Sequence, residues 1–419
     1  MNLTRKFSTL LLGSAVALVV VILPQVSMAL SPAEVNKIAK DITVRIDGQS
    51  PGSGVIIKRN GTTYTVLTAA HVVATPDEYQ VITQDGKQYQ VDAKTILKFP
   101  NVDMAMLTFA SNQAYTVVKL GDANQISEGS PSFVAGFPSR SQALTDIIYN
   151  FTVGTITANA KRPLSDGYAL VYSNNTLPGM SGGPVLDSEG RLLGIHGRAD
   201  TTTKVQDQSI NPDIFIKTGF NLGIPINTFL RLAPAGTVAL SPIPTASEPS
   251  ELRADDFYLQ ALDRYSQGDM SGALTQVTKA IQQNSRFAPA YALRGNVRLV
   301  GQDQGGAFQD FNQALQLDNG LLQAYIGRAL VQSSLGDEGA AIADYTQAIN
   351  IQGDHAILYY NRGIVLYNQG KQAEALQDLR ISADLALKEN NQTDYQRALE
   401  AITIASKDCR QSIRSICDR

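Results

Sequence analysis

Three short motifs carry the residue types of nucleophilic catalysis. His71 ends the segment TAAH, Asp103 opens the apolar run in NVDMAML, and Ser181 lies among glycines in PGMSGGPV. A serine hydroxyl becomes a strong nucleophile when a neighbouring imidazole accepts its proton, and a carboxylate holds that imidazole in the required tautomer. These three residues therefore suit acyl transfer through a serine.

The order of the motifs along the chain separates two families of serine hydrolase. The segment GMSGG also fits the G-x-S-x-G turn of α/β-hydrolases, but there the serine precedes the acid and the histidine. Here His71 comes first, followed by Asp103 and then Ser181. With this order, residues from about 42 to 230 resemble a bacterial trypsin-like (chymotrypsin-fold) serine protease. The resemblance implies that His71 is the general base, Asp103 its partner and Ser181 the nucleophile. It also implies an oxyanion hole formed by the N–H groups of Gly179 and Ser181.

The same resemblance implies which residues line the primary specificity pocket (S1). They are Asn175, Thr176, His196, Gly197 and Arg198. Thr176 and His196 are similar to the pair found in glutamyl endopeptidases, whereas Asn175 stands where a trypsin specific for basic residues carries Asp. A hydroxyl and an imidazole can hydrogen-bond a carboxylate, and Arg198 can add charge, so the pattern favours cleavage after an acidic residue. The alternative is that His196 is a strand residue satisfied by backbone and that Arg198 is solvated.

One position departs from the animal members of this family. Met180 precedes the serine where those enzymes carry an Asp that pairs with a newly formed N-terminus. Activation by that ion pair is therefore not expected. The protease region also contains no Cys, so its barrels must be held together by burial alone.

The elements that must position these residues are short strands. Segments such as ITVRI, TTYTVLTAA and LLGIHG are rich in Val, Ile, Thr and aromatic residues and are separated by turn residues. We expect residues 30–232 to form an all-β double β-barrel of the chymotrypsin-like kind. A Pro-rich linker over 233–252 follows.

A second, all-α part repeats with a period of 34 residues. Aromatic residues mark the same place in each unit, at Phe257, Tyr291, Tyr325 and Tyr359. A helix–turn–helix unit of this length with small residues at the helix crossings resembles the tetratricopeptide repeat (TPR). We expect four TPR units over 253–389 that form a solenoid, and a helical cap over 390–419.

Composition excludes several classes of protein. The chain has 419 residues, with 35 Lys and Arg against 38 Asp and Glu, so it lacks the basic excess of a general nucleic-acid binder. Only 3 His and 2 Cys occur, and no cluster or phosphate-binding loop suggests a metal or another cofactor, so none is expected.

The two ends of the chain carry further signals. Residues 1–29 have the basic start, the apolar middle and the small-residue cleavage site of a signal peptide. We expect export to the periplasm or the medium, with membrane attachment only if this segment is not cleaved. Near the other end, Cys409 and Cys417 are a candidate disulfide in an oxidising compartment. They lie about 12 Å apart along a continuous helix, so the bond requires the helix to break between them.

Two hypotheses of function follow. The first is a secreted serine endopeptidase that acts on polypeptides, with the concave TPR groove recruiting a protein or peptide partner or the substrate itself. The second is a TPR-based adaptor with a vestigial protease domain.

Overall fold

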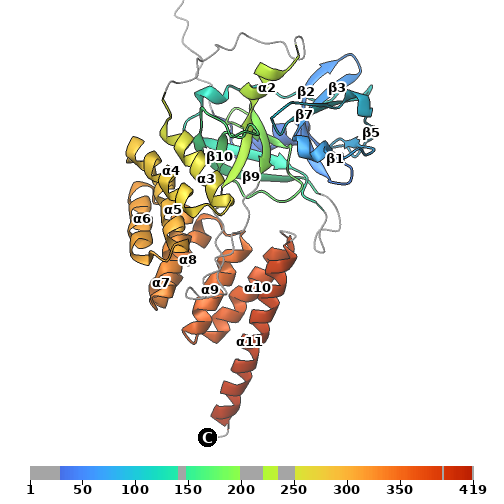
Figure 1. Ribbon diagram of the computed structural model, residues 1–419. Coiled ribbons are helices and arrows are strands. Elements are labelled where there is room, and N and C mark those ends of the chain that lie inside the picture. The colour runs from blue at the N-terminus through green and yellow to red at the C-terminus, as the bar shows by residue number, and fades with distance from the viewer. Residues whose placement is uncertain (1–28, 140–147, 199–219, 235–250, 389–390, 418–419) are drawn as a thin grey trace, which may run out of the picture.

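The computed structural model describes residues 29–139, 148–198, 220–234, 251–388 and 391–417. Nearly all of the expected signal segment and most of the expected linker lie outside these ranges. A β-rich part comes first, and an array of helices follows it (Figure 1). The predicted order of an all-β part and an all-α part is confirmed.

The first sheet has seven strands, in the order β5-β4-β1-β2-β3-β7-β6. Its strands are β1 (Thr43–Asp47), β2 (Gly52–Asn60), β3 (Thr63–Thr68), β4 (Gln80–Ile82), β5 (Gln88–Gln90), β6 (Leu97–Lys98) and β7 (Ala105–Ala110). Helix α1 (Pro32–Ile42) precedes it, and its N-terminus is closed by a capping box between Ser31 and Glu34. This sheet is curled, and its short edge strands do not close it into a barrel.

The second sheet is a closed barrel, in the order β10-β13-β12-β11-β8-β9. It consists of β8 (Pro131–Gly136), β9 (Asn150–Asn159), β10 (Leu170–Tyr172), β11 (Pro184–Leu186), β12 (Leu192–Arg198) and β13 (Asn221–Pro225), and helix α2 (Ile226–Leu232) follows. Side chains from both sheets share one core, in which Val55 and Leu67 of the first sheet meet Phe133 and Ile195 of the barrel. This shared core fixes the position of one sheet relative to the other.

The helical part consists of four antiparallel helix pairs. They are α3 (Ala254–Ser266) with α4 (Met270–Gln283), α5 (Ala288–Val300) with α6 (Gln304–Leu317), α7 (Leu322–Ser334) with α8 (Glu338–Ile351), and α9 (Ala356–Asn368) with α10 (Gln372–Lys388). Each pair begins 34 residues after the previous one, as the repeat predicts. Three of the turns use a glycine with φ near +80°, at Gly268, Gly336 and Gly370. In the second pair Gln302 takes this conformation (φ 65°), although Gly301 stands beside it.

An ion pair recurs inside the repeats at the same spacing. Its members are Arg294–Asp310, Arg328–Asp344 and Arg362–Asp378. Each arginine also lies over the aromatic ring that marks its repeat, 5.3 to 5.7 Å from the ring centre. A planar guanidinium that binds both carboxylate oxygens fixes the geometry between the two helices of a pair.

Helix α11 (Gln392–Cys417) runs unbroken from the last helix pair to the C-terminal end (Figure 1). The break that a Cys409–Cys417 bond requires is not present in this helical backbone, and the side chains of both residues lie outside the described part. The bond therefore stays a prediction that needs α11 to open at its end. Within the described ranges, no helix is both long and apolar enough to cross a membrane.

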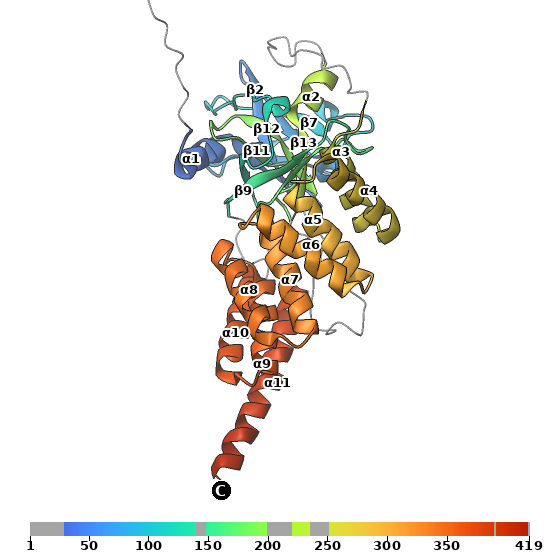
Figure 2. The ribbon, with the colours of Figure 1, turned by 90° about the vertical axis from the view of Figure 1, so that its left-hand side faces the viewer.

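The first repeat packs directly against the barrel, as the two views show (Figure 2). Tyr258 of α3 meets Phe220 edge to face, with 6.0 Å between the ring centres. The Asp256 carboxylate accepts a hydrogen bond from the backbone N–H of Arg162 at 2.7 Å. The two parts of the protein thus share apolar and polar contacts and are not held apart by the linker.

Candidate active site

Two neighbouring strands place His71 beside Asp103. His71 lies in a single 3-10 turn (Ala70–Val73) that follows β3, and Asp103 lies in the turn that precedes β7. Strands β3 and β7 are antiparallel partners, with Thr68 opposite Ala105. The end of one strand therefore meets the start of the other, and the two side chains come together.

The His71–Asp103 pair has the geometry of a base and its orienting carboxylate. The imidazole Nδ1 lies 2.7 Å from Asp103 Oδ2, and the backbone N–H of His71 donates to Oδ1 at 2.9 Å. The hydroxyl of Tyr168 donates to Oδ2 at 2.6 Å. Burial raises the pKa of Asp103, but the hydrogen bonds from His71 and Tyr168 outweigh it and bring the pKa down to about 2. Asp103 is therefore ionised at any working pH.

Ser181 lies in a tight loop between Gly179 and Gly182. Both glycines have positive φ, of 95° and 86°, and a Cβ on Gly182 would overlap the carbonyl of Ser53. Neither Gly179 N–H nor Ser181 N–H donates a hydrogen bond to any residue that the structure describes. Two unpaired backbone donors on one loop are what an oxyanion hole requires.

The hydroxyl of Ser181 has its own partner in this structure. Ser181 Oγ donates to the carbonyl of Gly197 at 3.0 Å, and among the described residues no hydrogen bond joins it to His71. In a site without substrate, the hydrogen bond between a nucleophile and its base is often long and tightens only when substrate binds. The hydroxyl must turn away from Gly197 before His71 can accept its proton.

Met180, the residue before the serine, is fully buried. Its sulfur accepts hydrogen bonds from the Leu177 N–H at 3.4 Å and from Asn150 at 3.6 Å. Apolar packing therefore fills the place where animal proteases form an ion pair.

Among the expected pocket residues, His196 is buried, with 1% of its surface exposed. Its Nδ1 shares a hydrogen bond of 2.7 Å with the hydroxyl of Tyr172. Burial, assisted by the nearby His71, lowers the pKa of His196 to about 3, so the ring is neutral. Nε2 has no hydrogen-bond partner among the described residues. The alternative interpretation, that backbone groups satisfy this ring, is not what the structure shows.

Thr176 and Arg198 have hydrogen-bond and ion-pair partners that their spacing in the sequence did not indicate. Thr176 donates its hydroxyl proton to Asn221 at 2.6 Å. Arg198 pairs with Asp166, lies 3.5 Å from Asp263 of α3, and stacks over a tyrosine ring. Arg198 is thus exposed yet paired with two carboxylates, and its contribution of charge to the pocket stays a prediction.

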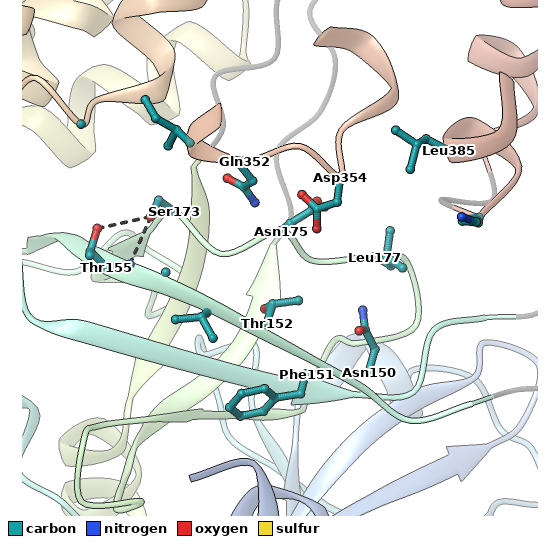
Figure 3. A pocket seen from close by; sticks show the side chains of 15 residues that line it. Asn150, Phe151, Thr152, Thr155, Ser173, Asn175, Leu177, Gln352, Asp354 and Leu385 are labelled. Carbon is teal, nitrogen blue, oxygen red and sulfur yellow. Dashed lines mark hydrogen bonds between the residues drawn. The ribbon is translucent and has the colours of Figure 1, made fainter. Parts of the chain in front are cut away.

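Asn175 faces a cavity of about 510 Å³ between the barrel and the repeats (Figure 3). One wall is β9 with the segment 173–177. The opposite wall is formed by Ile351, the last residue of α8, by Gln352 and Asp354 just beyond it, and by α10. Hydrogen bonds between Ser173 and Thr155 tie the segment 173–177 to β9. The loop that leads to Ser181 thus borders a space that the repeats enclose.

The functional residues that sequence patterns missed are Tyr168, Tyr172, Asn221 and Asp166. All four contact an expected site residue from distant positions in the chain, and none belongs to a motif. Within the described ranges, no three His, Cys, Asp or Glu residues are grouped so that they could hold a metal ion.

Comparison with known proteins agrees with this geometry. Residues 52–195 match the family described as trypsin-like peptidase domain. Over these residues the chain is similar to trypsin-like peptidase domains. In the helical part, residues 322–355 match the tetratricopeptide repeat family.

Several curated relatives match the peptidase domain at modest identity. "Serine protease Do-like HtrA" of Lactococcus lactis subsp. cremoris is 27% identical over 187 residues, which cover 44% of each chain. "Probable periplasmic serine endoprotease DegP-like" of Pseudomonas putida (strain GB-1) is 31% identical over 157 residues, covering 37% of this chain and 30% of that protein. The chain thus spans less than half the length of these relatives.

A solved structure, "Crystal structure of Deg5", also aligns with the chain. It is 20% identical, covers 48% of this chain and 90% of its own, and has a TM-score of 0.36. That score is too low to support any inference beyond the matches above.

Proposed function

We propose that this protein is an exported serine endopeptidase that cleaves polypeptides through an acyl-enzyme. The observation that carries the proposal is the ionised Asp103 held against His71, next to a serine loop with two unpaired N–H donors. Export is supported by the relatives in Pseudomonas, which are named as probable periplasmic serine endoproteases.

The geometry assigns a role to each group. Ser181 Oγ attacks the scissile carbonyl while His71 Nε2 accepts its proton. Asp103 keeps the Nδ1–H tautomer and stabilises the imidazolium that forms. The N–H groups of Gly179 and Ser181 bind the oxyanion. His71 then returns the proton to the leaving amine, and water repeats the sequence to release the acyl group.

A fluorophosphonate probe tests this function without knowledge of the substrate. We expect the full-length protein to be labelled at Ser181 and Ser181→Ala to lose labelling, with turnover of peptides falling by about 10⁶. Ser188→Ala, in the turn after β11, is a control that should label at the wild-type rate. No labelling of the wild-type protein would favour the adaptor hypothesis instead.

For specificity, we propose a preference for an acidic residue before the scissile bond. The support is His196, whose Nε2 has no hydrogen-bond partner among the described residues. If the Tyr172 hydroxyl turns from the Leu222 carbonyl and donates to Nδ1, Nε2 carries the proton and can donate to a carboxylate. Peptides that differ only in Glu, Gln or Leu at that position test it. We expect at least tenfold higher kcat/KM for Glu, and equal cleavage of all three would refute the preference.

We further propose that the repeats recruit the polypeptide to be cleaved or a protein partner. The cavity beside Asn175 supports this, because Ile351 from the repeats and Val153 from β9 expose apolar surface there, with 43% and 50% of each side chain accessible. We expect Ile351→Glu to raise KM for a protein substrate and to leave cleavage of a tetrapeptide unchanged. Leu335→Glu, on the same repeat but outside the cavity, is the matched control. Equal effects of the two variants would contradict recruitment at this cavity.

A further inference from the structure

We propose that Tyr168 and Arg198 are positioning residues through which the first TPR helix supports the catalytic pair. This inference rests on the proposed peptidase function and adds to it a role for the repeats in the chemistry itself.

An unbroken series of contacts runs from helix α3 to Asp103. Asp263 of α3 lies 3.5 Å from the guanidinium of Arg198, which also pairs with Asp166. That guanidinium stacks over the ring of Tyr168, 4.9 Å from its centre. The hydroxyl of Tyr168 then donates to Asp103 Oδ2 at 2.6 Å.

The backbone around this series leaves Tyr168 little freedom. A Cβ on Gly197 would overlap the Tyr168 hydroxyl, so that the ring lies directly against β12. The backbone N–H of Asp103 donates to the carbonyl of Asp166 at 2.8 Å, and the Asp166 side chain holds Arg198. Strand β12, the loop before β10 and the turn of Asp103 are thus linked at one point.

The carboxylates around Tyr168 give Arg198 a stabilising role. Asp103, Asp166 and Asp263 are three carboxylates, and the cations among them are Arg198 and, when it is protonated, His71. Burial and the Asp103 charge raise the pKa of Tyr168 far above its ordinary value, so its hydroxyl always donates. Without Arg198, the ring would lose its stacking partner and the carboxylates would repel one another.

The effect on catalysis has a defined direction. A hydrogen bond from Tyr168 spreads the charge of Asp103 and thereby weakens its hold on a protonated His71. When that hydrogen bond loosens, Asp103 stabilises the imidazolium form of its partner more strongly, and the acid limb of the rate profile moves to higher pH. If removal of the Asp263 charge acted on the catalytic pair only through long-range electrostatics, the acid limb of the rate profile would instead move to lower pH.

Variants of the full-length protein test the inference. Tyr168→Phe removes only the hydroxyl, and Asp263→Asn removes only the charge on α3. Asp384→Asn serves as the matched control, because Asp384 is exposed on α10 and forms no ion pair with any residue that the structure describes. For each, kcat and KM are measured from pH 5 to 9, and the low-field ¹H NMR signal of His71 Nδ1–H is recorded at pH 5.

We expect Tyr168→Phe to lower kcat about tenfold with KM unchanged, and to move the acid limb up by about half a pH unit. Asp263→Asn should lower kcat about threefold and move the limb in the same direction, and Asp263→Glu should restore both. The double variant should be no slower than Tyr168→Phe alone, because both changes act through one contact.

An unchanged acid limb in Tyr168→Phe, or an Asp263→Asn variant that behaves like Asp384→Asn, would overturn the inference. If the wild-type protein is not labelled by a fluorophosphonate, the peptidase function itself fails. The NMR signal still decides the structural part in that case. A shift in Asp263→Asn supports the link from α3 to the His71–Asp103 pair, and an unshifted signal refutes it.

Discussion

Replacing Asp103 by Asn tests the central feature of the site with little change of shape. Asp103 accepts from His71 N–H, from His71 Nδ1 and from the Tyr168 hydroxyl, at 2.9, 2.7 and 2.6 Å. An amide can offer only one oxygen to these donors. Its NH₂ group would face the backbone N–H of His71 if it took the place of Oδ1, or both Nδ1–H and the Tyr168 hydroxyl if it took the place of Oδ2. The imidazole then favours the tautomer whose Nε2 carries the proton and cannot serve as a base.

The expected loss is about 10⁴ in the rate of Ser181 acylation, or about 5 kcal/mol of transition-state stabilisation. Because the pKa of Asp103 is about 2, the carboxylate is ionised throughout the assay range and the loss should not vary with pH above about 4. The assay is the second-order rate of fluorophosphonate labelling, which needs no peptide substrate. Asp47→Asn, on β1 and away from the site, controls for the substitution itself. Labelling of Asp103→Asn within tenfold of the wild-type rate would refute the role given to this carboxylate.

Three further predictions follow from other contacts. Gly197→Ala puts a methyl group on the Tyr168 hydroxyl, and we expect about tenfold slower labelling with an unchanged far-UV circular dichroism spectrum; a full-rate variant would contradict this. Arg328→Met leaves the buried Asp344 carboxylate without its ion pair, and we expect urea unfolding to show a loss of about 2–3 kcal/mol, most of which a second change to Leu at 344 should recover. Burial and the adjacent carboxylate of α3 raise the pKa of Glu128 to about 8, so its contribution to docking of the repeats is complete below about pH 4.5 and is lost as the pH rises through 8. Glu128→Gln should therefore raise the melting temperature at pH 8 but not at pH 4.5, and equal shifts at both would exclude this cause.

The sequence predicts the helix repeats and the His71–Asp103 pair, because local patterns encode both. The 34-residue period predicted four helix pairs because each pair repeats the same small and aromatic positions, and the structure begins a new pair every 34 residues. His71 and Asp103 could be paired because both lie in conspicuous motifs at strand ends. The predicted fold class is confirmed, with the first sheet curled and the second closed; the edge strands β5 and β6 of the first sheet have three and two residues and pair on only one side.

Contacts between distant segments were beyond such patterns. Tyr168 is a single tyrosine in a loop, and its partner Asp103 lies 65 positions earlier in the chain. Arg198 stands at a pocket position in the sequence, yet the residue that redirects it, Asp263, belongs to a helix of the first repeat. The packing of the repeats on the barrel therefore decides whether Arg198 pairs with Asp263 or turns toward the specificity pocket.

The interface between barrel and repeats also makes the peptidase domain dependent on the helices. The N–H groups of Asn159 and Arg162, at the end of β9 and just beyond it, donate to Asp255 and Asp256 of α3. Without α3 these donors and the apolar face around Val171 would be exposed to solvent. A β-rich part cut before the repeats would therefore lose the hydrogen bonds to α3 and the burial of this apolar face, and with them part of its free energy of unfolding. The same helix carries Asp263 toward Arg198. A displacement of α3 would therefore reach β12 and Asp103 through the contacts of Asp263, Arg198 and Tyr168 that already exist.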